Sequence, residues 1–501
     1  MQSQQELIAK KIKSSRKQLG ITQAEFAKAL STSQSAVNRM EAGKQNFSLD
    51  MLTRIGEVLG HELVTLADDS VNFRIVGGNE LKGEITTKVS KNASVSLLAA
   101  SLLNEGQTKL RNIPRIEEVN RLVEVLRSIG VSVEWVKNDL IIQPPKRLKL
   151  DKINRQAGAK TRSIIMFIGS LIHITNDFKL PYAGGCKLGE RSIRPHLYGL
   201  EHFGVEVETK SHNYHVSVKG KTDDEEIILY EAGDTVTENV LMAAARKPGK
   251  TTIKFASANY MVQDLCYFLQ ELGVKIEGIG TTTLIVHGKT KIKKDVEYSP
   301  SEDPIEAMLF LSIAAVTKSS LTIKRCAIDF LELELLKLRK MGFHCETTKT
   351  YKAKNGRTDL VDIKTYPSDL VATPDKVAAR PYPGLNIDNL PFFVPIAAVA
   401  KGRTLIHDWV YENRAVYYTE LNKLGANIEL ADPHRVYVNG RTRFSAADMT
   451  APPALRPAVI ILTAMLAAKG TSTLRNVYSI NRGYEDLASR LNSLGADITI
   501  F

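Results

Sequence analysis

The chain has 501 residues, which is too long for a single ordinary core and predicts two or three domains. Hydrophobic residues make up 43% and charged residues 24%, the balance of a soluble globular protein, and no apolar run reaches the ~18–20 residues of a membrane span. The formal net charge of +12 favours anionic partners such as DNA, phosphates or carboxylates, without choosing among them.

The N-terminal region is predicted to form four short helices. The polar segment 4–18 has a helical pattern and is unlike a secretory signal. Thr22 caps a second helix, and Glu25, three residues later, completes a capping-box pattern. A third helix is predicted over 34–42 and a fourth over 49–59. The apolar positions of the second and third helices that are expected to face inward are Phe26, Ala27, Leu30, Ala36, Val37 and Met40.

Two short helices joined by a tight turn, the second with a polar outer face, are typical of a helix-turn-helix. Over about residues 5–67, the text ITQAEFAKALSTSQSAVNRMEAGKQNFSLDMLTRIGEVLG resembles the phage-repressor (Cro/C1, or XRE) family. The resemblance implies that residues 1–68 bind DNA, and a homodimer is expected of an operator reader because one such domain alone binds weakly. A helical bundle for protein contacts or dimerisation is the alternative. The resemblance implies that base edges are contacted by Gln34, Ser35, Asn38 and Arg39. It implies that phosphates are bound by Thr22, Gln23 and Lys44.

The helical pattern gives way near residues 68–72 to the alternation VNFRIVGG and LKGEITTKV, which places a domain boundary there. Residues 1–68 hold nine Lys and Arg against seven Asp and Glu, so +10 of the net charge lies in the remainder. A basic enzyme surface that attracts phosphorylated substrates explains this charge as well as DNA binding does.

One pattern then recurs six times, in which a helix ends in Gly-hydrophobic and a strand follows, as in ELGVKIEG and SLGADITI. Most of these helices follow a strand such as GKTTIKFA, which itself follows a markedly apolar helix such as AVIILTAMLAA. A fixed period implies repeated units, and helices this apolar belong inside the sheets. The pattern predicts two three-unit α/β lobes, with an ordinary tandem α/β protein as the alternative. The glycines that would end the six helices are Gly130, Gly204, Gly273, Gly342, Gly425 and Gly495.

The cysteines lie far apart, without a Cys-x-x-Cys pair, at Cys186, Cys266, Cys326 and Cys345. This spacing makes structural zinc and a disulfide framework poor interpretations and favours a reduced, cytoplasmic location. Cys186 differs from the others because it lies in GGCKLGER, where glycines give backbone access and basic neighbours favour a thiolate. A lone cysteine is usually a small buried hydrophobe, but one in a Gly-rich basic loop is a better nucleophile or acid candidate.

Other motifs suit an anionic substrate. Lys91, in Ser90-Lys91-Asn92-Ala93, opens an apolar helix whose free N–H groups make an anion site, although a charged cap is the plainer interpretation. Asp388 lies in the loop after RPYPG, and a solvated carboxylate or a helix cap is the alternative interpretation. Four arginines have a planar fork that suits a carboxylate or phosphate, although each alone is more often a surface ion-pair partner: Arg162, Arg414, Arg456 and Arg482. The last of these lies in Asn481-Arg482-Gly483-Tyr484-Glu485, which is expected to open the last helix.

With these motifs and repeats, residues 72–501 resemble the enolpyruvyl transferases (EPSP synthase-like), and within them the UDP-N-acetylglucosamine 1-carboxyvinyltransferases of peptidoglycan synthesis. The resemblance implies a two-lobed inside-out α/β barrel of six βαβαββ-type repeats, with the active site between the lobes. Lobe one would cover about 91–300, and lobe two 72–90 plus 301–501. Phosphoenolpyruvate and UDP-N-acetylglucosamine would be the substrates, and no metal or organic cofactor is expected.

The resemblance also implies residue roles. Cys186 would protonate or add to phosphoenolpyruvate, and Asp388 would take the proton of the attacking sugar hydroxyl. The hydroxyl would attack C2 as a proton reaches C3, and phosphate would leave the resulting ketal with its charge stabilised by Lys and Arg. The implied catalytic set is Cys186, Asp388, Lys91 and Arg482, and the implied substrate-binding set is Asn92, Arg162, Arg191, Arg414 and Arg456.

The acceptor side departs from the family pattern. Arg194 replaces a uracil-reading Asp, Ala454 replaces an Asp before Leu-Arg, and Glu231 and Asp234 lie where the family holds a diphosphate. Three hypotheses stay open. The protein is an active UDP-N-acetylglucosamine enolpyruvyl transferase that regulates its own operon, or an enolpyruvyl transferase with another acceptor. The third is a non-enzymatic regulator whose body senses a ligand for the DNA-binding domain.

Overall fold

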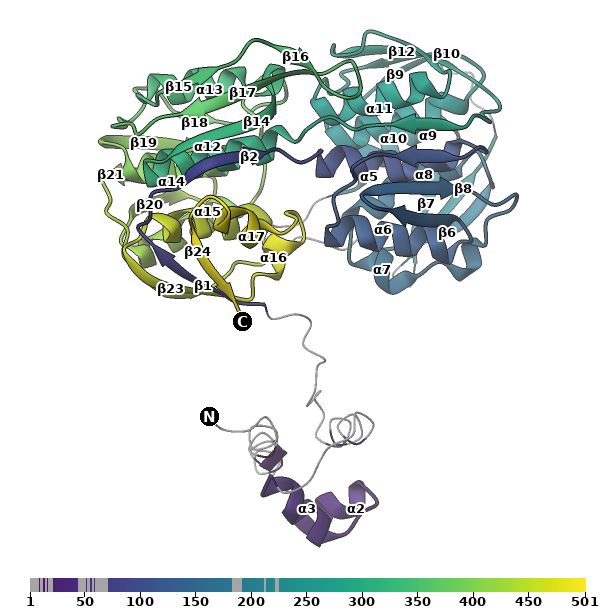
Figure 1. Cartoon of the computed structure of the whole chain (residues 1–501). Helices are drawn as coiled ribbons and strands as arrows, with labels where there is room; N and C mark the ends of the chain where they lie inside the picture. The colour runs from purple at the N-terminus through teal and green to yellow at the C-terminus, as the bar shows by residue number, and fades with distance from the viewer. Residues whose placement is uncertain are drawn as a thin grey trace. The chain divides into compact units, whose positions relative to one another are not determined.

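The chain forms two compact units, Met1–Ser70 and Val71–Phe501 (Figure 1). The computed structural model describes residues 21–43, 71–182, 192–210, 213–220 and 225–501, and the single residues Ala9, Ile12, Lys13, Arg16, Met51, Ile55 and Val58. None of the helices in these stretches is both long and apolar enough to cross a membrane.

In the N-terminal unit, α2 (Gln23–Ala29) and α3 (Gln34–Glu41) form the predicted pair of short helices. The predicted capping box is confirmed, because the Thr22 hydroxyl accepts from the Glu25 N–H and the Glu25 carboxylate accepts from the Thr22 N–H at 2.7 Å. All six positions expected to face inward are buried in one apolar cluster with Ile12 and Ile55. The alternation of buried and exposed positions therefore gave the correct inner face of both helices.

A buried ion pair joins the segment around Arg16 to α3. Arg16 Nε donates to Glu41 Oε1 at 2.5 Å, and Arg16 Nη1 donates to the Ile21 carbonyl at 2.7 Å. The second oxygen of Glu41 accepts from Gln23 Nε2 at 2.9 Å. Since removal of one partner would leave an uncompensated buried charge, this pair holds three helical segments in one arrangement.

The C-terminal unit has six sheets among its described residues, three in each of two lobes (Figure 1). In five of the six, one pair of strands is parallel and the other pairs are antiparallel. Lobe one holds the sheets β13 (Val296–Tyr298)-β3 (Thr108–Leu110)-β5 (Asp139–Gln143)-β4 (Ser132–Val136), β6 (Asp177–Pro181)-β8 (Asn213–Val218)-β7 (Val205–Lys210) and β11 (Lys275–Glu277)-β12 (Thr283–Gly288)-β10 (Gly249–Lys254)-β9 (Glu226–Ile228).

Lobe two repeats this arrangement. One short strand, β16 (Tyr351–Lys352), pairs with β17 (Asp359–Thr365) outside the strand order of its sheet. Its sheets are β22 (Asp448–Thr450)-β23 (Gly470–Arg475)-β1 (Phe73–Gly77)-β24 (Asp497–Ile500), β15 (Cys345–Thr347)-β17 (Asp359–Thr365)-β14 (Ser320–Ala327)-β2 (Lys82–Thr86) and β18 (Val377–Ala378)-β19 (Gly402–His407)-β21 (Arg435–Gly440)-β20 (Asn427–Asp432).

The most apolar helices lie inside these sheets. Every residue of α12 (Pro304–Thr317) up to Val316 is buried, whereas strands such as β1 alternate between buried and exposed positions. This confirms the expected inside-out arrangement, because a helix that is apolar all round must be covered on every face. The inner helices are α5 (Lys91–Ala100), α10 (Asp234–Arg246), α11 (Tyr260–Glu271), α12 (Pro304–Thr317), α14 (Phe393–Val399) and α15 (Leu455–Ala467).

The remaining helices of the C-terminal unit connect its strands. They are α6 (Glu117–Ser128), α7 (Arg155–Ala159), α8 (Phe167–Leu171), α9 (Arg194–Glu201), α13 (Glu332–Lys340), α16 (Tyr478–Asn481) and α17 (Leu487–Asn492), with 3-10 turns η1 (Ser101–Leu103), η2 (Leu150–Lys152), η3 (Arg162–Met166), η4 (Ile328–Phe330), η5 (Leu390–Phe392) and η6 (Ala415–Leu424). The six repeat glycines all have φ between +75° and +96°, so each ends its helix in the left-handed region, as the pattern predicted.

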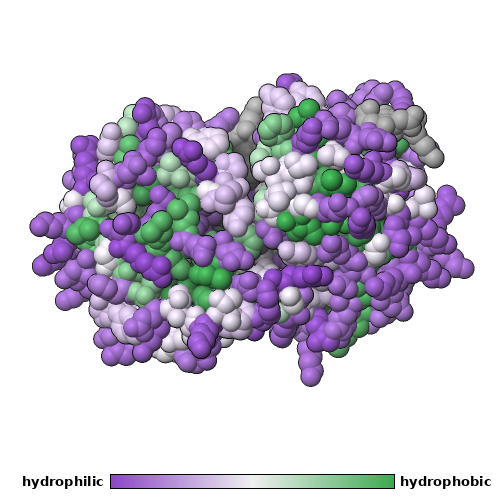
Figure 2. Space-filling view, turned by 90° about the horizontal axis from the view of Figure 1, so that it is seen from above, coloured by the Kyte–Doolittle hydropathy of each residue, from purple (hydrophilic) through white to green (hydrophobic). Residues whose placement is uncertain are grey.

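The two lobes of the C-terminal unit are linked where the chain crosses between them. The crossing segments pair at Val89 and Glu302, and the Ser90 N–H donates to the Ser301 carbonyl at 2.8 Å. The hairpin of β16 and β17 reaches lobe one as well, where Asn355 Nδ2 lies 3.4 Å from Asp264 Oδ1. Figure 2 shows a surface that is mostly hydrophilic, with hydrophobic patches on both lobes and a furrow between them.

Candidate active site

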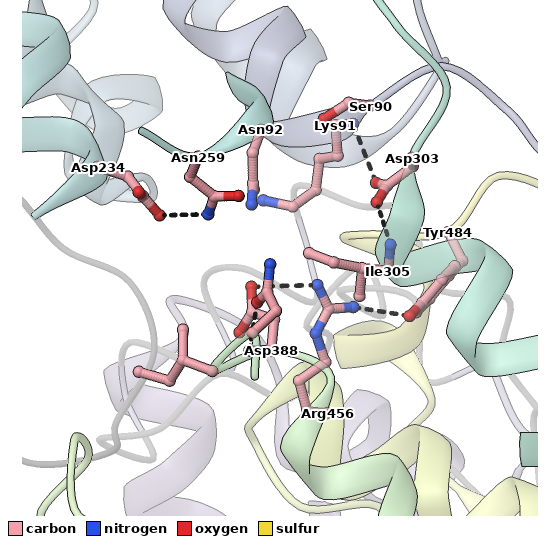
Figure 3. Close-up of polar contacts among 12 residues, drawn as sticks. Ser90, Lys91, Asn92, Asp234, Asn259, Asp303, Ile305, Asp388, Arg456 and Tyr484 are labelled. Atoms are coloured by element: carbon pink, nitrogen blue, oxygen red, sulfur yellow. Dashed lines mark hydrogen bonds and ion pairs between the residues drawn. The ribbon is translucent and has the colours of Figure 1, made fainter. Parts of the chain in front are cut away.

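Side chains from both lobes converge around Lys91 and Asp388 (Figure 3). Lys91 is the first residue of α5, because Ser90 caps that helix by accepting from the Ala93 N–H at 3.1 Å. Asp388 comes from the loop before η5 in lobe two, and Arg456 from the first turn of α15. The helix start that the sequence predicted at Lys91 is therefore at the junction of the lobes.

Lys91 is held by a carboxylate that the sequence did not reveal. Its Nζ donates to Glu118 Oε2, on α6, at 2.7 Å. The other oxygen of Glu118 accepts from the hydroxyls of Ser163 at 2.7 Å and Thr161 at 3.3 Å. Burial alone would raise the pKa of Glu118, but Lys91, Ser163 and Arg482 together lower it to about 2. Glu118 therefore stays ionised and fixes the direction of the Lys91 ammonium.

Asp388 lies between two guanidinium groups. Arg456 Nη2 approaches its Oδ2 at 3.3 Å, and Arg414 Nη1 lies 3.7 Å from its Oδ1. Burial would raise the pKa of Asp388, but Arg456, Arg414 and Lys91 outweigh it and hold that pKa below its usual value. We call Lys91, Glu118, Asp388, Arg414 and Arg456 the cationic cluster.

Within the cationic cluster, Arg414 is buried and binds both a second aspartate and the backbone of the Asp388 loop. It is 1% exposed, and its Nε and Nη2 bind Asp408 at 2.6 and 2.9 Å. Its Nη2 also donates to the Ile387 carbonyl at 2.7 Å, which fixes the loop that carries Asp388. Arg414 therefore fixes the Asp388 loop, and its implied contact with substrate stays a prediction.

Arg456 is oriented by a tyrosine, and a second aspartate lies within the influence of its charge. Its Nη1 donates to the Tyr484 hydroxyl at 2.7 Å. Asp303 caps α12 by accepting from the Ile305 N–H at 2.8 Å, and it also accepts from the Lys91 N–H at 3.3 Å. Burial raises the pKa of Asp303 to about 6, against the opposing charge of Arg456. The Arg456 guanidinium is thus held between the Tyr484 hydroxyl and the Asp388 carboxylate (Figure 3).

The wall of lobe one opposite Asp388 is acidic. Asp234, the first residue of α10, accepts from Ser257 Oγ at 2.5 Å and from Asn259 Nδ2 at 3.1 Å. Glu238 lies one turn further along α10, is 1% exposed, and its Oε1 has no hydrogen-bond partner among the described residues. Burial raises the pKa of both carboxyls, and their neighbours Asp388 and Asp234, respectively, raise it further. We call Asp234 and Glu238 the acidic wall.

Asn92 lies between the cationic cluster and the acidic wall. Its Nδ2 donates to the buried Tyr260 hydroxyl at 3.2 Å. Burial raises the pKa of Tyr260 well above its usual value, and the charges of Asp303, Asp388 and Asp234 add to this. Figure 3 shows Asn92 and Asp234 on one side of a common space and Asp388 and Arg456 on the other.

The remaining predicted residues have different placements. Arg162 Nη2 donates to the Ser192 carbonyl at 3.0 Å, and Arg482 is half-buried. The motif around Arg482 was expected to open the last helix, which is wrong: α16 ends at Asn481, and α17 begins at Leu487, after Asp486 with φ +50°. Cys186, Arg191 and Lys44 lie outside the described residues.

On the acceptor side, Arg194 is the first residue of α9 and Ala454 is fully buried at the N-cap of α15. The Glu231 carboxylate lies over Gly233, because its Oε1 is 2.9 Å from where a Cβ of Gly233 would be. No group of three or more His, Cys, Asp or Glu within the described stretches is arranged to hold a metal ion.

The predicted base-reading residues of the N-terminal unit share one surface. Gln34, Ser35, Asn38 and Arg39 are all exposed on α3. Of the predicted phosphate-binding residues, Thr22 has its N–H taken by Glu25, and Gln23 has its side chain taken by Glu41. The structure therefore leaves the outer face of α3 accessible, whereas the polar groups at the start of α2 are engaged within the unit.

Comparison with known families agrees with this architecture. Residues 75–491 match the EPSP synthase (3-phosphoshikimate 1-carboxyvinyltransferase) family, and residues 12–65 match the helix-turn-helix family. The chain belongs to the EPSP synthase family of enolpyruvyl transferases. A helix-turn-helix domain precedes the transferase, so both sequence resemblances are confirmed.

Curated relatives extend over the whole transferase. The chain is 32% identical over 430 residues to the UDP-N-acetylglucosamine 1-carboxyvinyltransferase of Bradyrhizobium diazoefficiens, which covers 85% of this chain and 97% of that protein. It is 34% identical over 427 residues to the Campylobacter hominis protein of the same name, with 85% and 98% covered. The enolpyruvyl transferase NikO from Streptomyces tendae shares the fold, with a TM-score of 0.74, 23% identity, and 86% and 99% of the two chains covered.

Several residues of the site were missed in the sequence. Glu118, Tyr260 and Asp303 come from different repeats, and nothing local distinguishes them from a helix-surface acid, a core aromatic and a helix cap. Asp303 precedes Pro304, a pair that predicts the start of a helix and nothing more.

Proposed function

We propose that the protein transfers the enolpyruvyl group of phosphoenolpyruvate to the 3-hydroxyl of UDP-N-acetylglucosamine and releases phosphate, as a cytoplasmic step of peptidoglycan precursor synthesis. The observation that carries this proposal is the cationic cluster, where an ionised carboxylate, Asp388, lies among Lys91, Arg414 and Arg456. Such a site suits a multiply charged anion and keeps a proton acceptor beside it. The names of the relatives support this choice of substrates.

In this mechanism, Lys91, Arg456 and Arg482 bind the carboxylate and phosphate of phosphoenolpyruvate. The acceptor hydroxyl attacks C2, Asp388 takes the hydroxyl proton, and Cys186 supplies the proton that reaches C3. The tetrahedral ketal then loses phosphate from C2 and one proton from C3, which returns to Cys186, and the enol ether forms. Arg191 and Arg162 would add positive charge on the lobe-one side, and Asn92 would contact the sugar.

The test is phosphate release from phosphoenolpyruvate in the presence of UDP-N-acetylglucosamine, in the wild type and in Cys186→Ala. We expect release that requires both substrates and falls at least about a hundredfold in the variant, the range of one positioned proton donor. Release with another acceptor only would contradict the proposed acceptor. Absence of release with every acceptor, together with ligand-dependent DNA binding, would favour a regulator without catalysis.

A second candidate is enolpyruvyl transfer to a different acceptor, which the acidic wall favours. Asp234 and Glu231 lie at the start of α10, and Arg194 starts α9, so the charges on this side differ from those of the family pattern. The same assay with a panel of uncharged sugars decides between the two candidates.

We further propose that the N-terminal unit binds DNA through the outer face of α3. The exposed side chains of Gln34, Ser35, Asn38 and Arg39 support this, because amide and guanidinium groups read base edges in the major groove. The expected result is salt-sensitive operator binding that the double variant Asn38→Ala/Arg39→Ala abolishes while enolpyruvyl transfer is unchanged. Binding that survives the double change would exclude α3 as the reading helix.

A further inference from the structure

The acidic wall differs from the cationic cluster in the partners of its carboxylates. The two hydrogen-bond donors to Asp234 are the neutral groups of Ser257 and Asn259, on the segment that leads into α11. Glu118 and Asp388, by contrast, each face a Lys or Arg. A negative charge brought to Asp234 would therefore meet uncompensated negative charge, whereas one brought to Lys91 or Arg456 would meet positive charge.

Asp234 and Asn259 face the same space as Asp388. Figure 3 shows them on one side of that space, with Asn92 and Lys91 beside them and Asp388 and Arg456 opposite. The two aspartates are close enough for the charge of Asp388 to raise the pKa of Asp234. An acceptor whose hydroxyl reaches Asp388 is thus also within the field of Asp234.

The start of α10 would ordinarily attract an anion. A helix of 13 residues has free N–H groups and a partial positive charge at its N-terminus. Here Asp234 occupies the first position, and the Glu231 carboxylate lies over the N-cap residue Gly233. The chain thus places its own carboxylates where a phosphate would bind.

We propose that Asp234 is a specificity-determining residue of the acceptor subsite: its carboxylate accepts hydrogen bonds from an uncharged, hydroxyl-bearing part of the acceptor and excludes phosphate from the start of α10. This inference rests on the proposed enolpyruvyl transfer. For UDP-N-acetylglucosamine it places sugar hydroxyls, and not the diphosphate, against Asp234. A carboxylate suits this task because it offers several lone pairs, of which Ser257 and Asn259 use only part.

The test compares two acceptors in Asp234→Asn and in the wild type. The probes are UDP-N-acetylglucosamine and the uncharged methyl glycoside of N-acetylglucosamine, each measured by kcat/KM for phosphate release and by its dissociation constant in calorimetry. Since each compound is compared with itself, the contribution of the uridine cancels. We expect the preference for the uncharged compound over UDP-N-acetylglucosamine to fall by about tenfold in the variant, the size of one local charge effect.

Two further variants keep the result interpretable. Glu231→Gln should shift the preference in the same direction by a smaller factor, because Glu231 is exposed. Asp177→Asn removes the same charge from β6, on an outer sheet of lobe one, and should leave the preference unchanged. A shift in Asp177→Asn equal to that in Asp234→Asn would overturn the proposal, because it would show a general charge effect.

The outcomes separate this inference from the proposed function. A preference that stays within twofold of wild type in Asp234→Asn, or that moves towards the uncharged compound, overturns the role of Asp234. Phosphate release with neither acceptor contradicts the proposed transfer, but the two dissociation constants still measure the selection against phosphate. If the wild type binds neither compound, Asp234 does not contact an acceptor of this class and the inference is wrong.

Discussion

The cationic cluster and the acidic wall both lie at least half-buried, yet the pKa values of their carboxyl groups shift in opposite directions. The pKa of Glu118 falls to about 2 and that of Asp388 falls below its usual value, whereas the pKa values of Asp234 and Glu238 rise. Burial pushes all four upward, so the difference comes from the partners, which are Lys and Arg in the cluster and neutral groups in the wall. The comparison indicates that one side of the site is built for an anion and the other for a hydrogen-bond donor.

The largest expected effect comes from Asp388→Asn, which removes the proposed proton acceptor from the cluster. We expect kcat to fall by about 10²- to 10⁴-fold, the usual contribution of a positioned general base. Phosphoenolpyruvate should bind at least as tightly as in the wild type, because one negative charge beside it is gone. Steady-state phosphate release and calorimetry measure the two quantities, and a kcat within tenfold of wild type would contradict the role of Asp388.

Lys91→Met should destabilise the protein, since it leaves Glu118 buried without its cation. The expected loss in the free energy of unfolding is about 3–5 kcal/mol, the usual cost of breaking one side of a buried pair. The double variant Lys91→Met/Glu118→Gln should regain most of that loss in denaturant unfolding. If the single and double variants are equally unstable, Lys91 and Glu118 are not coupled as the 2.7 Å contact indicates.

Acidification should weaken the same pair. The pKa of Glu118 is about 2 in the folded protein against an ordinary 4.5, so its contribution is full above about pH 5 and is lost as the pH falls towards 2. A shift of this size corresponds to about 3 kcal/mol of unfolding free energy. In Glu118→Gln this part of the pH dependence should be absent. Parallel pH profiles for wild type and variant between pH 5 and 2 would show that the carboxylate is not the titrating group.

A smaller effect is expected from Tyr484→Phe, which removes the hydroxyl that orients Arg456 at 2.7 Å. One lost hydrogen bond to a charged group is worth about 1.5–3 kcal/mol at most, so KM for phosphoenolpyruvate should rise several-fold to tens-fold. KM for the acceptor should be unchanged, because Tyr484 belongs to the cationic side. An equal rise in both KM values would mean that the two sides of the site are not separable.

Sequence patterns predicted what depends on local structure. The capping box at Thr22, the inward positions of α2 and α3, and the helix ends at the six repeat glycines each follow from a few neighbouring residues, and each is confirmed. The resemblance also placed Lys91, Asp388 and Arg456 among the site candidates, and the structure brings these three together.

The parts that sequence reasoning missed depend on distant contacts. Lys91 and Glu118 are 27 residues apart, and Arg456 and Asp388 are 68 apart, so no local period reveals either pair. The predicted start of the last helix was wrong because α17 begins only at Leu487, after Asp486 with a left-handed backbone at φ +50°. Arg414 was recognised as a site residue, but its burial behind Asp388 follows only from its ion pair with Asp408.

The separate apolar clusters of the two units have a thermodynamic consequence. Among the described residues, the cluster that contains Phe26 and Met40 shares no member with the cluster of the transferase. Cooperative melting requires a shared core, so calorimetry of the whole chain should resolve two transitions, of which the smaller belongs to Met1–Ser70. Operator DNA should raise the temperature of that transition alone, and phosphoenolpyruvate the temperature of the other alone, because a ligand stabilises only the unit that it binds.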